Sequence, residues 1–324
     1  MAKPSLCKDF LRASWWTWHF MKHGYNLRLL PGEETITDNL LIYLVHRHQK
    51  QLRIYRLNKS EESEYGADWE WWFHTRRTKE ADVWVGMRVQ AKKLNPCTLR
   101  YESLGKGEQA DNLIEQVHEP LDKFIRDIAE KKKFMAPIYV FYNYWCLEAA
   151  CQEKTLQKHG EQTCSDNTVF DHADHPCKKH PPGCTMADAR KVRELIRGKK
   201  PSHALNFWNL HQEMFCWADL VCCKGERNHM SGNGTVGIAE HVEEVLRSHG
   251  IETRHRDRGR NNDGYRSFLI ESPPTYVQKI LQGEELSERE ALEVDAGFVW
   301  VISGDDVQQD AAYCCLDSLY KPTV

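Results

Sequence analysis

The sequence lacks several features that would place the protein in a specialised class. It has no uninterrupted apolar run long enough to cross a bilayer, and its start, MAKPSLCKDFLRASWW, lacks the apolar core and cleavage site of a signal peptide. It contains no internal repeat, no Walker-type phosphate loop and no helicase signature. It also lacks a basic excess, with a net charge of -3, so any nucleic-acid surface must be local. These absences predict a cytoplasmic protein that makes no membrane contact and is not an ATP-driven motor.

The composition is that of an ordinary globular protein. Of 324 residues, 41% are hydrophobic and 28% are charged, which is compatible with one elaborated domain or two. The twelve cysteines are irregularly spaced, and without a signal peptide this pattern suits a reducing compartment better than a disulfide framework. We therefore expect Cys222 and Cys223, which close an apolar run, to behave as small buried hydrophobic residues.

The stretch from Gly66 to Leu94 predicts two strands joined by a polar turn. Residues 68–73 and 83–89 are rich in the aromatic and β-branched residues that favour strands. The segment between them is polar and charged. A hairpin is therefore the expected structure.

This hairpin predicts a site at which polar groups converge. Alternate side chains of a strand share a face, so Asp68 and Glu70 should point one way, and Gln90 and Lys92 should point together from the neighbouring strand. Carboxylate and carbonyl oxygens are the hard ligands that Mg²⁺ prefers, and an ammonium beside them can hold a phosphate or orient the attacking water.

The elements around the hairpin match one architecture. We predict a helix over 33–48, a strand over 53–57, a second helix over 107–132 and a buried strand over 138–142. Helix, three strands, helix, strand is the core order of the PD-(D/E)XK, or restriction-endonuclease-like, nuclease superfamily, which residues 30–145 resemble. The resemblance implies an α/β fold with an αβββαβ core, in which helices flank a mixed central sheet.

Within this resemblance, Asp68 corresponds to the metal-binding acid, and Gln90-Ala91-Lys92 to the (D/E/Q)xK motif in its glutamine form. That form is familiar from Mrr-like restriction nucleases and related antiphage-defence effectors. Glu34 corresponds to the acid that the first helix often contributes, with Glu33 as the near alternative. The resemblance thus implies Mg²⁺ or Mn²⁺ held by Asp68, Glu34 and Gln90, with Lys92 orienting the water and steadying the phosphate.

One departure from the family pattern matters. The more usual second acid is replaced by the neutral Gln90, so metal affinity should depend more on Asp68, Glu34 and Glu70. Gln109 resembles a polar residue that many members place beside the site. The alternative is that Asp68 caps a strand and the other polar groups lie on a solvated face. The setting argues against that alternative, because polar groups are costly to bury among apolar strand residues.

The resemblance implies a metal-dependent nuclease that hydrolyses phosphodiester bonds. We expect a DNA endonuclease of bacterial restriction or antiphage defence, acting on double-stranded DNA and leaving a 5′-phosphate. A homodimer is expected, because a double-strand break is made most easily by two copies of the site; the sequence indicates no operon partner. Two alternatives stay open: a nucleic-acid-binding or assembly protein without catalysis, and an RNase.

A second group of candidate metal ligands lies between Cys164 and Cys184. Cys164, His175, Cys177 and Cys184 could hold tetrahedral Zn²⁺, although this segment contains no CxxC or HxxxH pair. The alternative is a polar insertion loop whose Cys184 packs at the start of the next helix. In either case we expect a structural role, because soft ligands do not suit the hard, exchangeable ion of phosphodiester hydrolysis.

Basic and aromatic side chains supply the candidates for nucleic-acid contact. Arg76, Arg77 and Lys93 lie on or beside the hairpin and could contact phosphates. Residues 10–21 predict a Trp-rich helix, whose side chains could stack on bases if exposed. Packing against the core is the favoured interpretation of that helix.

The rest of the chain predicts less. Residues 148–182 read as an insertion, and the later elements are predicted as helices over 186–196, 237–249 and 274–281 and strands over 219–223 and 297–302. We divide the chain into a nuclease core with the N-terminal aromatic helix, 1–147, and an α+β elaboration, 148–324, that completes the fold or reads the target.

Overall fold

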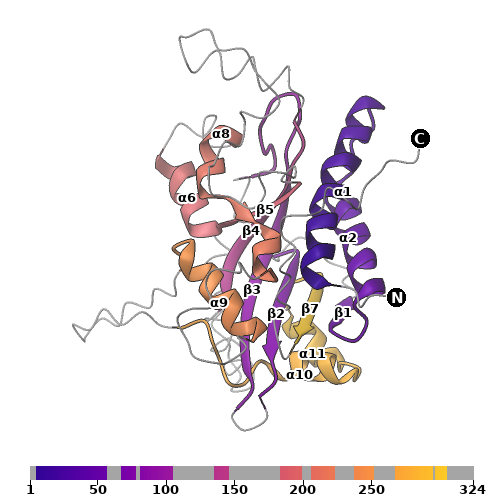
Figure 1. The fold of residues 1–324 in the computed structure, drawn as a ribbon, viewed down its shortest axis with the longest axis vertical. Coiled ribbons are helices and arrows are strands. Elements are labelled where there is room, and N and C mark those ends of the chain that lie inside the picture. Colours follow the sequence, from indigo (N-terminus) through magenta and orange to yellow (C-terminus); the bar gives the residue numbers. More distant parts are fainter. Residues whose placement is uncertain are drawn as a thin grey trace, which may run out of the picture.

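A mixed β-sheet forms the middle of the computed structural model (Figure 1). The structure describes residues 5–56, 67–77, 81–104, 135–145, 183–198, 206–222, 237–251, 267–294 and 296–304. Within these ranges the strands are β1 (Leu52–Arg56), β2 (Trp69–Thr75), β3 (Val83–Lys93), β4 (Ala136–Tyr142), β5 (Cys184–Asp188), β6 (Phe215–Cys216) and β7 (Phe298–Ser303). They form a seven-stranded sheet in the order β1-β7-β2-β3-β4-β5-β6.

The strand directions follow from this order. The predicted hairpin is confirmed, since β2 and β3 pair antiparallel. Strand β3 pairs parallel with β4, and such a pair requires a crossover connection. The helix expected over 107–132 would be that connection, but it lies outside the described residues. Strand β7 lies between β1 and β2, antiparallel to the first and parallel to the second.

Helices cover both faces of the sheet (Figure 1). One face packs against α1 (Leu6–Asn26), α2 (Glu33–Arg47) and α9 (Ile238–Ser248). The other packs against α6 (Ala189–Gly198), α8 (Phe207–Leu210) and α10 (Thr275–Gln282), with α11 (Glu288–Glu293) beyond them. Because both faces are covered, β2 and β4 are buried along their whole length, which suits the nearly continuous apolar sequence of β4.

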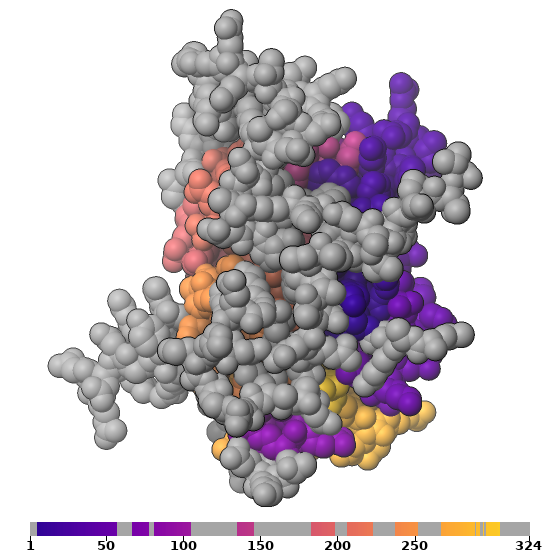
Figure 2. All heavy atoms as spheres, viewed as in Figure 1, coloured from indigo at the N-terminus to yellow at the C-terminus, as the bar shows by residue number. Residues whose placement is uncertain are grey.

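Helices α1 and α2 lie side by side on one flank of the molecule. In the space-filling view their indigo and purple atoms gather along one edge, with the yellow atoms of residues 267–304 below them (Figure 2). Phe10 of α1 is fully buried, whereas the tryptophans of the same helix are half-buried. Trp16 stacks on Phe20, and Trp18 packs edge-on against Trp145.

Three predictions from the sequence are wrong. Residues 184–188 form a strand before the helix, which begins only at Ala189. Residues 217–220 form a short 3₁₀ helix, which includes the first two positions of the strand expected over 219–223. Cys222 is not a free thiol, because it forms a disulfide with Cys7 that joins α1 to a segment 215 residues away.

In the part of the chain that the structure describes, no helix has both the length and the apolar character needed to cross a membrane.

Candidate active site

Asp68 and Gln90 lie opposite each other where the β2–β3 hairpin opens. Trp69 pairs with Val89, which places the preceding Asp68 against Gln90 on the other strand. Two hydrogen bonds hold this arrangement: Asp68 N–H donates to the carbonyl of Val89 at 2.8 Å, and Ala91 N–H donates to Asp68 Oδ2 at 2.6 Å. The Asp68 carboxylate is therefore fixed beside the segment Gln90-Ala91-Lys92.

The carboxyl group of Asp68 has a perturbed pKa. The residue is accessible to solvent, yet it sits at the rim of a densely packed sheet, and the partial loss of hydration raises its pKa to about 6. The hydrogen bond from Ala91 and the charge of Lys92 lower the pKa, while the charges of Glu33 and Glu34 raise it. Four groups from α2 and the hairpin therefore act on one another electrostatically.

Lys92 is the buried cation of the site. Its residue is 5% exposed, although lysine is seldom buried without a partner. Its charge acts on Asp68, and among the residues that the structure describes it makes no hydrogen bond or ion pair. No carboxylate of the described residues forms an ion pair with this buried ammonium, so it can accept a negatively charged ligand.

The first turn of α2 brings two glutamates to the hairpin, and they differ in what they do. Glu33 Oε1 accepts a hydrogen bond from Lys93 N–H at 2.9 Å and another from Ser103 Oγ at 3.1 Å. Glu34 is exposed and makes no hydrogen bond to another described residue. Glu33 thus fastens α2 to the end of β3, while the carboxylate of Glu34 faces solvent.

Glu70, which the sequence placed beside Asp68 on the same strand, is held by contacts to other parts of the fold. It is fully buried, and its Oε2 accepts from Tyr276 Oη at 2.5 Å and from Trp72 Nε1 at 3.2 Å. Gly86 faces Trp72 across the hairpin, and a Cβ there would lie 2.8 Å from the indole ring. Glu70 therefore ties the hairpin to α10. The sequence did not reveal Tyr276 as its partner, because the two residues are 206 positions apart.

The basic residues proposed for nucleic-acid contact occupy different places. Arg77 Nη2 donates to Glu240 of α9 at 2.5 Å, whereas Arg76 is exposed. Both follow β2, eight and nine residues beyond Asp68 and so roughly 26 to 30 Å from it along an extended chain. Lys93 lies at the site, but its Nζ donates to the carbonyl of Pro31 at 2.5 Å. Arg76 and Arg77 accordingly belong to the far end of the hairpin.

Cys184 is part of the core. Its thiol is buried in β5 and donates to Thr17 Oγ1 of α1 at 3.3 Å. Burial raises its pKa to about 12, which disfavours the thiolate that zinc requires. The other zinc candidates, Cys164, His175 and Cys177, and the supporting Gln109 lie outside the described residues. Within the described ranges, no three His, Cys, Asp or Glu side chains are grouped to hold a metal ion.

A serine, a histidine and an aspartate meet at the far end of β2. His74 Nδ1 lies 2.9 Å from Ser303 Oγ, and His74 Nε2 lies 2.9 Å from Asp82 Oδ2. In a catalytic triad the serine faces Nε2 and the carboxylate faces Nδ1, so the connections here are reversed. The imidazole is also buried and stacked on Trp84. This cluster joins the end of β7 to the hairpin and is a structural contact.

Comparison with curated proteins and with solved structures finds no match. The model of one family, described as a family of unknown function (DUF6615), matches residues 6–308. That range includes every described element from α1 to β7. The chain therefore belongs to the DUF6615 family.

Proposed function

We propose that this protein is a metal-dependent nuclease whose active site lies where the β2–β3 hairpin opens beside α2. The proposal follows the resemblance of residues 30–145 to the PD-(D/E)XK superfamily, with Asp68 and the QxK segment as the motif. The single observation that carries it is the hydrogen bond from Ala91 N–H, in the middle of the QxK segment, to the Asp68 carboxylate, with Lys92 buried one residue farther along.

Strand order supports the proposal in part. Helix α2, strand β1 and the β2–β3 hairpin follow one another in the chain, and β4 lies parallel to β3. The insertion of β7 between β1 and β2 is an addition to the expected core. Because β7 runs parallel to β2 and antiparallel to β1, it leaves β1 and β2 antiparallel to each other, as in a three-stranded meander.

The donor set fits a hard divalent cation. Asp68 has one carboxylate oxygen in a hydrogen bond to Ala91 and one that remains, Glu34 is exposed, and Gln90 carries a carboxamide oxygen. Mg²⁺ is commonly held by one or two carboxylates together with substrate phosphates and water. A closed cage of three acids is therefore not needed, and an open site leaves room for the phosphodiester.

The residues would divide the chemistry among themselves. Asp68 and Glu34 would hold the cation, with Gln90 adding its side-chain oxygen. When bound, the cation would neutralise charge on the scissile phosphate and help to ionise the attacking water. Lys92 would donate to a non-bridging phosphate oxygen and stabilise the charge that develops there. Glu33 would keep α2 at the hairpin through its hydrogen bond to Lys93.

A cleavage assay tests this function. Supercoiled double-stranded plasmid and a structured RNA are incubated separately with the purified protein in Mg²⁺, Mn²⁺ or EDTA, beside Asp68→Asn protein purified in the same way. We expect metal-dependent nicking or linearisation of the plasmid by the wild type alone. Cleavage of RNA but not of DNA would show that the substrate of the nuclease is RNA rather than DNA. Binding of DNA without cleavage in either metal would refute catalysis and favour the binding protein.

A further inference from the structure

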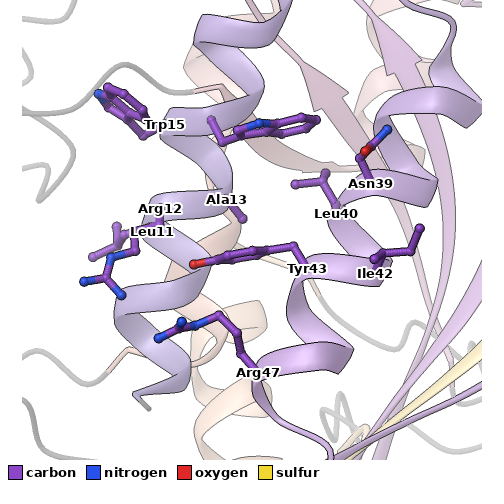
Figure 3. A pocket seen from close by; sticks show the side chains of 10 residues that line it. Leu11, Arg12, Ala13, Trp15, Asn39, Leu40, Ile42, Tyr43 and Arg47 are labelled. Atoms are coloured by element: carbon purple, nitrogen blue, oxygen red, sulfur yellow. The ribbon is translucent and has the colours of Figure 1, made fainter. Parts of the chain in front are cut away.

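A cavity of about 560 Å³ lies between α1 and α2. Its walls are mainly apolar and aromatic, with Trp15 and Trp16 from α1 and Leu40 and Ile42 from α2. Figure 3 shows Trp15 and Asn39 toward one end and Arg47 at the other. The volume falls in the range of small-molecule sites, about 300–1,000 Å³.

A hydrogen-bonded cluster of charged side chains lies at one end of the cavity. Asp9 is fully buried and accepts hydrogen bonds from Arg12 Nη1, Arg47 Nε and Tyr43 Oη, and its Oδ2 lies 2.9 Å from His48 Nε2. Burial would raise the pKa of Asp9, but the bonds from His48, Arg47, Tyr43 and Arg12 hold it well below its usual range. The carboxylate is therefore ionised at all ordinary pH values and fixes both guanidinium groups in place.

This cluster keeps an excess of positive charge. One carboxylate faces two guanidinium groups, so at least one positive charge remains whatever the protonation state of His48. Each arginine side chain is about one-third exposed, at 32% for Arg12 and 36% for Arg47. Their other N–H groups make no hydrogen bond or ion pair within the described ranges. They are therefore available, in a fixed orientation, beside an apolar cavity.

We propose that this cavity binds a small organic anion, in which a carboxylate or a phosphate is attached to an apolar body. The guanidinium groups of Arg12 and Arg47 would receive the anion, since guanidinium N–H groups match carboxylate and phosphate oxygens in pairs. The indole of Trp15 and the side chain of Ile42 would cover the apolar body, which gains from leaving water. Charge complementarity thus selects this occupant over an uncharged apolar one.

The site is separate from the candidate nuclease centre. The cavity is lined from Asn39 to Arg47 on α2, whereas Glu33 and Glu34 begin the same helix. No residue assigned to the nuclease chemistry lines it. Binding can therefore be measured without any nucleic acid, and its outcome does not depend on whether the protein cleaves a phosphodiester.

Calorimetric titration with a matched set of probes tests the proposal. 2-Naphthoate and 2-naphthyl phosphate carry the anion, naphthalene-2-carboxamide is neutral, and 2-naphthylmethylammonium is a cation of similar size. We expect one bound anion per chain and at least about tenfold weaker binding of the amide and the ammonium, because a single charge contact at short range is worth that much. The two anions together show whether carboxylate or phosphate is preferred.

Variants at Ile42 locate the site without disturbing the core. Ile42 is 70% exposed and lines the cavity, so Ile42→Asp and Ile42→Asn remove the same apolar contact and differ only in charge. We expect Ile42→Asp to weaken anion binding at least about fivefold more than Ile42→Asn does, through like-charge repulsion. Leu29→Asp is the control, because Leu29 is 75% exposed and lies outside the cavity; its binding should match the wild type.

Three results would overturn the proposal. The first is no saturable binding of either anion to the folded wild type. The second is equal affinity for the amide and the carboxylate, which would make the cavity an apolar hole without anion recognition. The third is equal binding by Ile42→Asp and Ile42→Asn, which would place the bound anion elsewhere on the molecule.

Discussion

Replacing Lys92 by methionine should abolish cleavage while leaving the fold intact. The Lys92 residue is 5% exposed, so methionine can occupy the path of its stem with little loss of packing. What it removes is the ammonium, whose burial costs free energy that the attraction to Asp68 only partly offsets. We therefore expect an unfolding midpoint equal to or above that of the wild type.

The loss of activity should be large. Removing a group that stabilises transition-state charge costs on the order of a hundred- to a thousandfold in rate, or about 3–4 kcal/mol. Initial rates of plasmid nicking in Mg²⁺ or Mn²⁺ measure this loss, and urea unfolding of the same samples measures stability.

Lys93→Met is the matched control for this experiment. Its Nζ donates to the carbonyl of Pro31, so this variant should lose about 1 kcal/mol of stability and keep its cleavage rate within a few-fold of the wild type. The reasoning is refuted if Lys92→Met cleaves at the wild-type rate, or if both lysine variants lose activity to the same extent.

Three other predictions concern the carboxylates. The pKa of Asp68, raised to about 6, predicts that cleavage increases with pH through that value, since the ionised form is required. The pKa of Asp68 in the folded protein exceeds the unfolded value of about 3.9. The contribution of Asp68 to the free energy of unfolding is therefore greatest below pH 4 and is lost as the pH rises through 6. The free energy of unfolding of Asp68→Asn should lack this pH-dependent decrease. Glu34→Gln should lower metal-dependent activity at unchanged stability, whereas Glu33→Gln should lower stability by about 1 kcal/mol, because it weakens the acceptor for two donors; a Glu33 variant with native stability would contradict this division. Glu70→Gln should cost about 1–3 kcal/mol of stability without changing the metal requirement of the folded protein, and complete inactivity at native stability would make Glu70 a metal ligand after all.

Local sequence patterns predicted most of the elements that position the site. The aromatic and β-branched residues of β2 and β3 indicated the hairpin, which the antiparallel pairing of the two strands confirms. Helices α2, α9 and α10 were also predicted within a few residues of their observed bounds. These elements are specified by neighbours in the chain, which a pattern can capture.

Contacts between distant residues could not be predicted in this way. Strand β7 looked like a strand, but nothing in its sequence indicates that it lies between β1 and β2. The role of Glu70 depends on Tyr276 from another helix, and the anchoring of Arg77 depends on Glu240. The Cys7–Cys222 disulfide could not be predicted for the same reason, because the composition gives the number of cysteines and not the distances between them.

Residues 217–220 show a different limit. The apolar sequence around them predicted a strand over 219–223. They instead form a 3₁₀ helix between the short strand β6 and the disulfide at Cys222. Short apolar runs do not distinguish a strand from a buried turn, since burial alone explains their composition. Packing against α1 and α9 decides the conformation there.

The most direct measurement of the central claim is the position of a bound cation. Crystals of the protein with Mn²⁺ and a short duplex DNA would show it by anomalous diffraction at the manganese edge. The account predicts a peak in contact with Asp68 and Glu34, close to the side-chain oxygen of Gln90, with Lys92 beside the nearest phosphate. A fully occupied Mn²⁺ elsewhere, with DNA bound and these four side chains contacting neither the ion nor a phosphate, would contradict it.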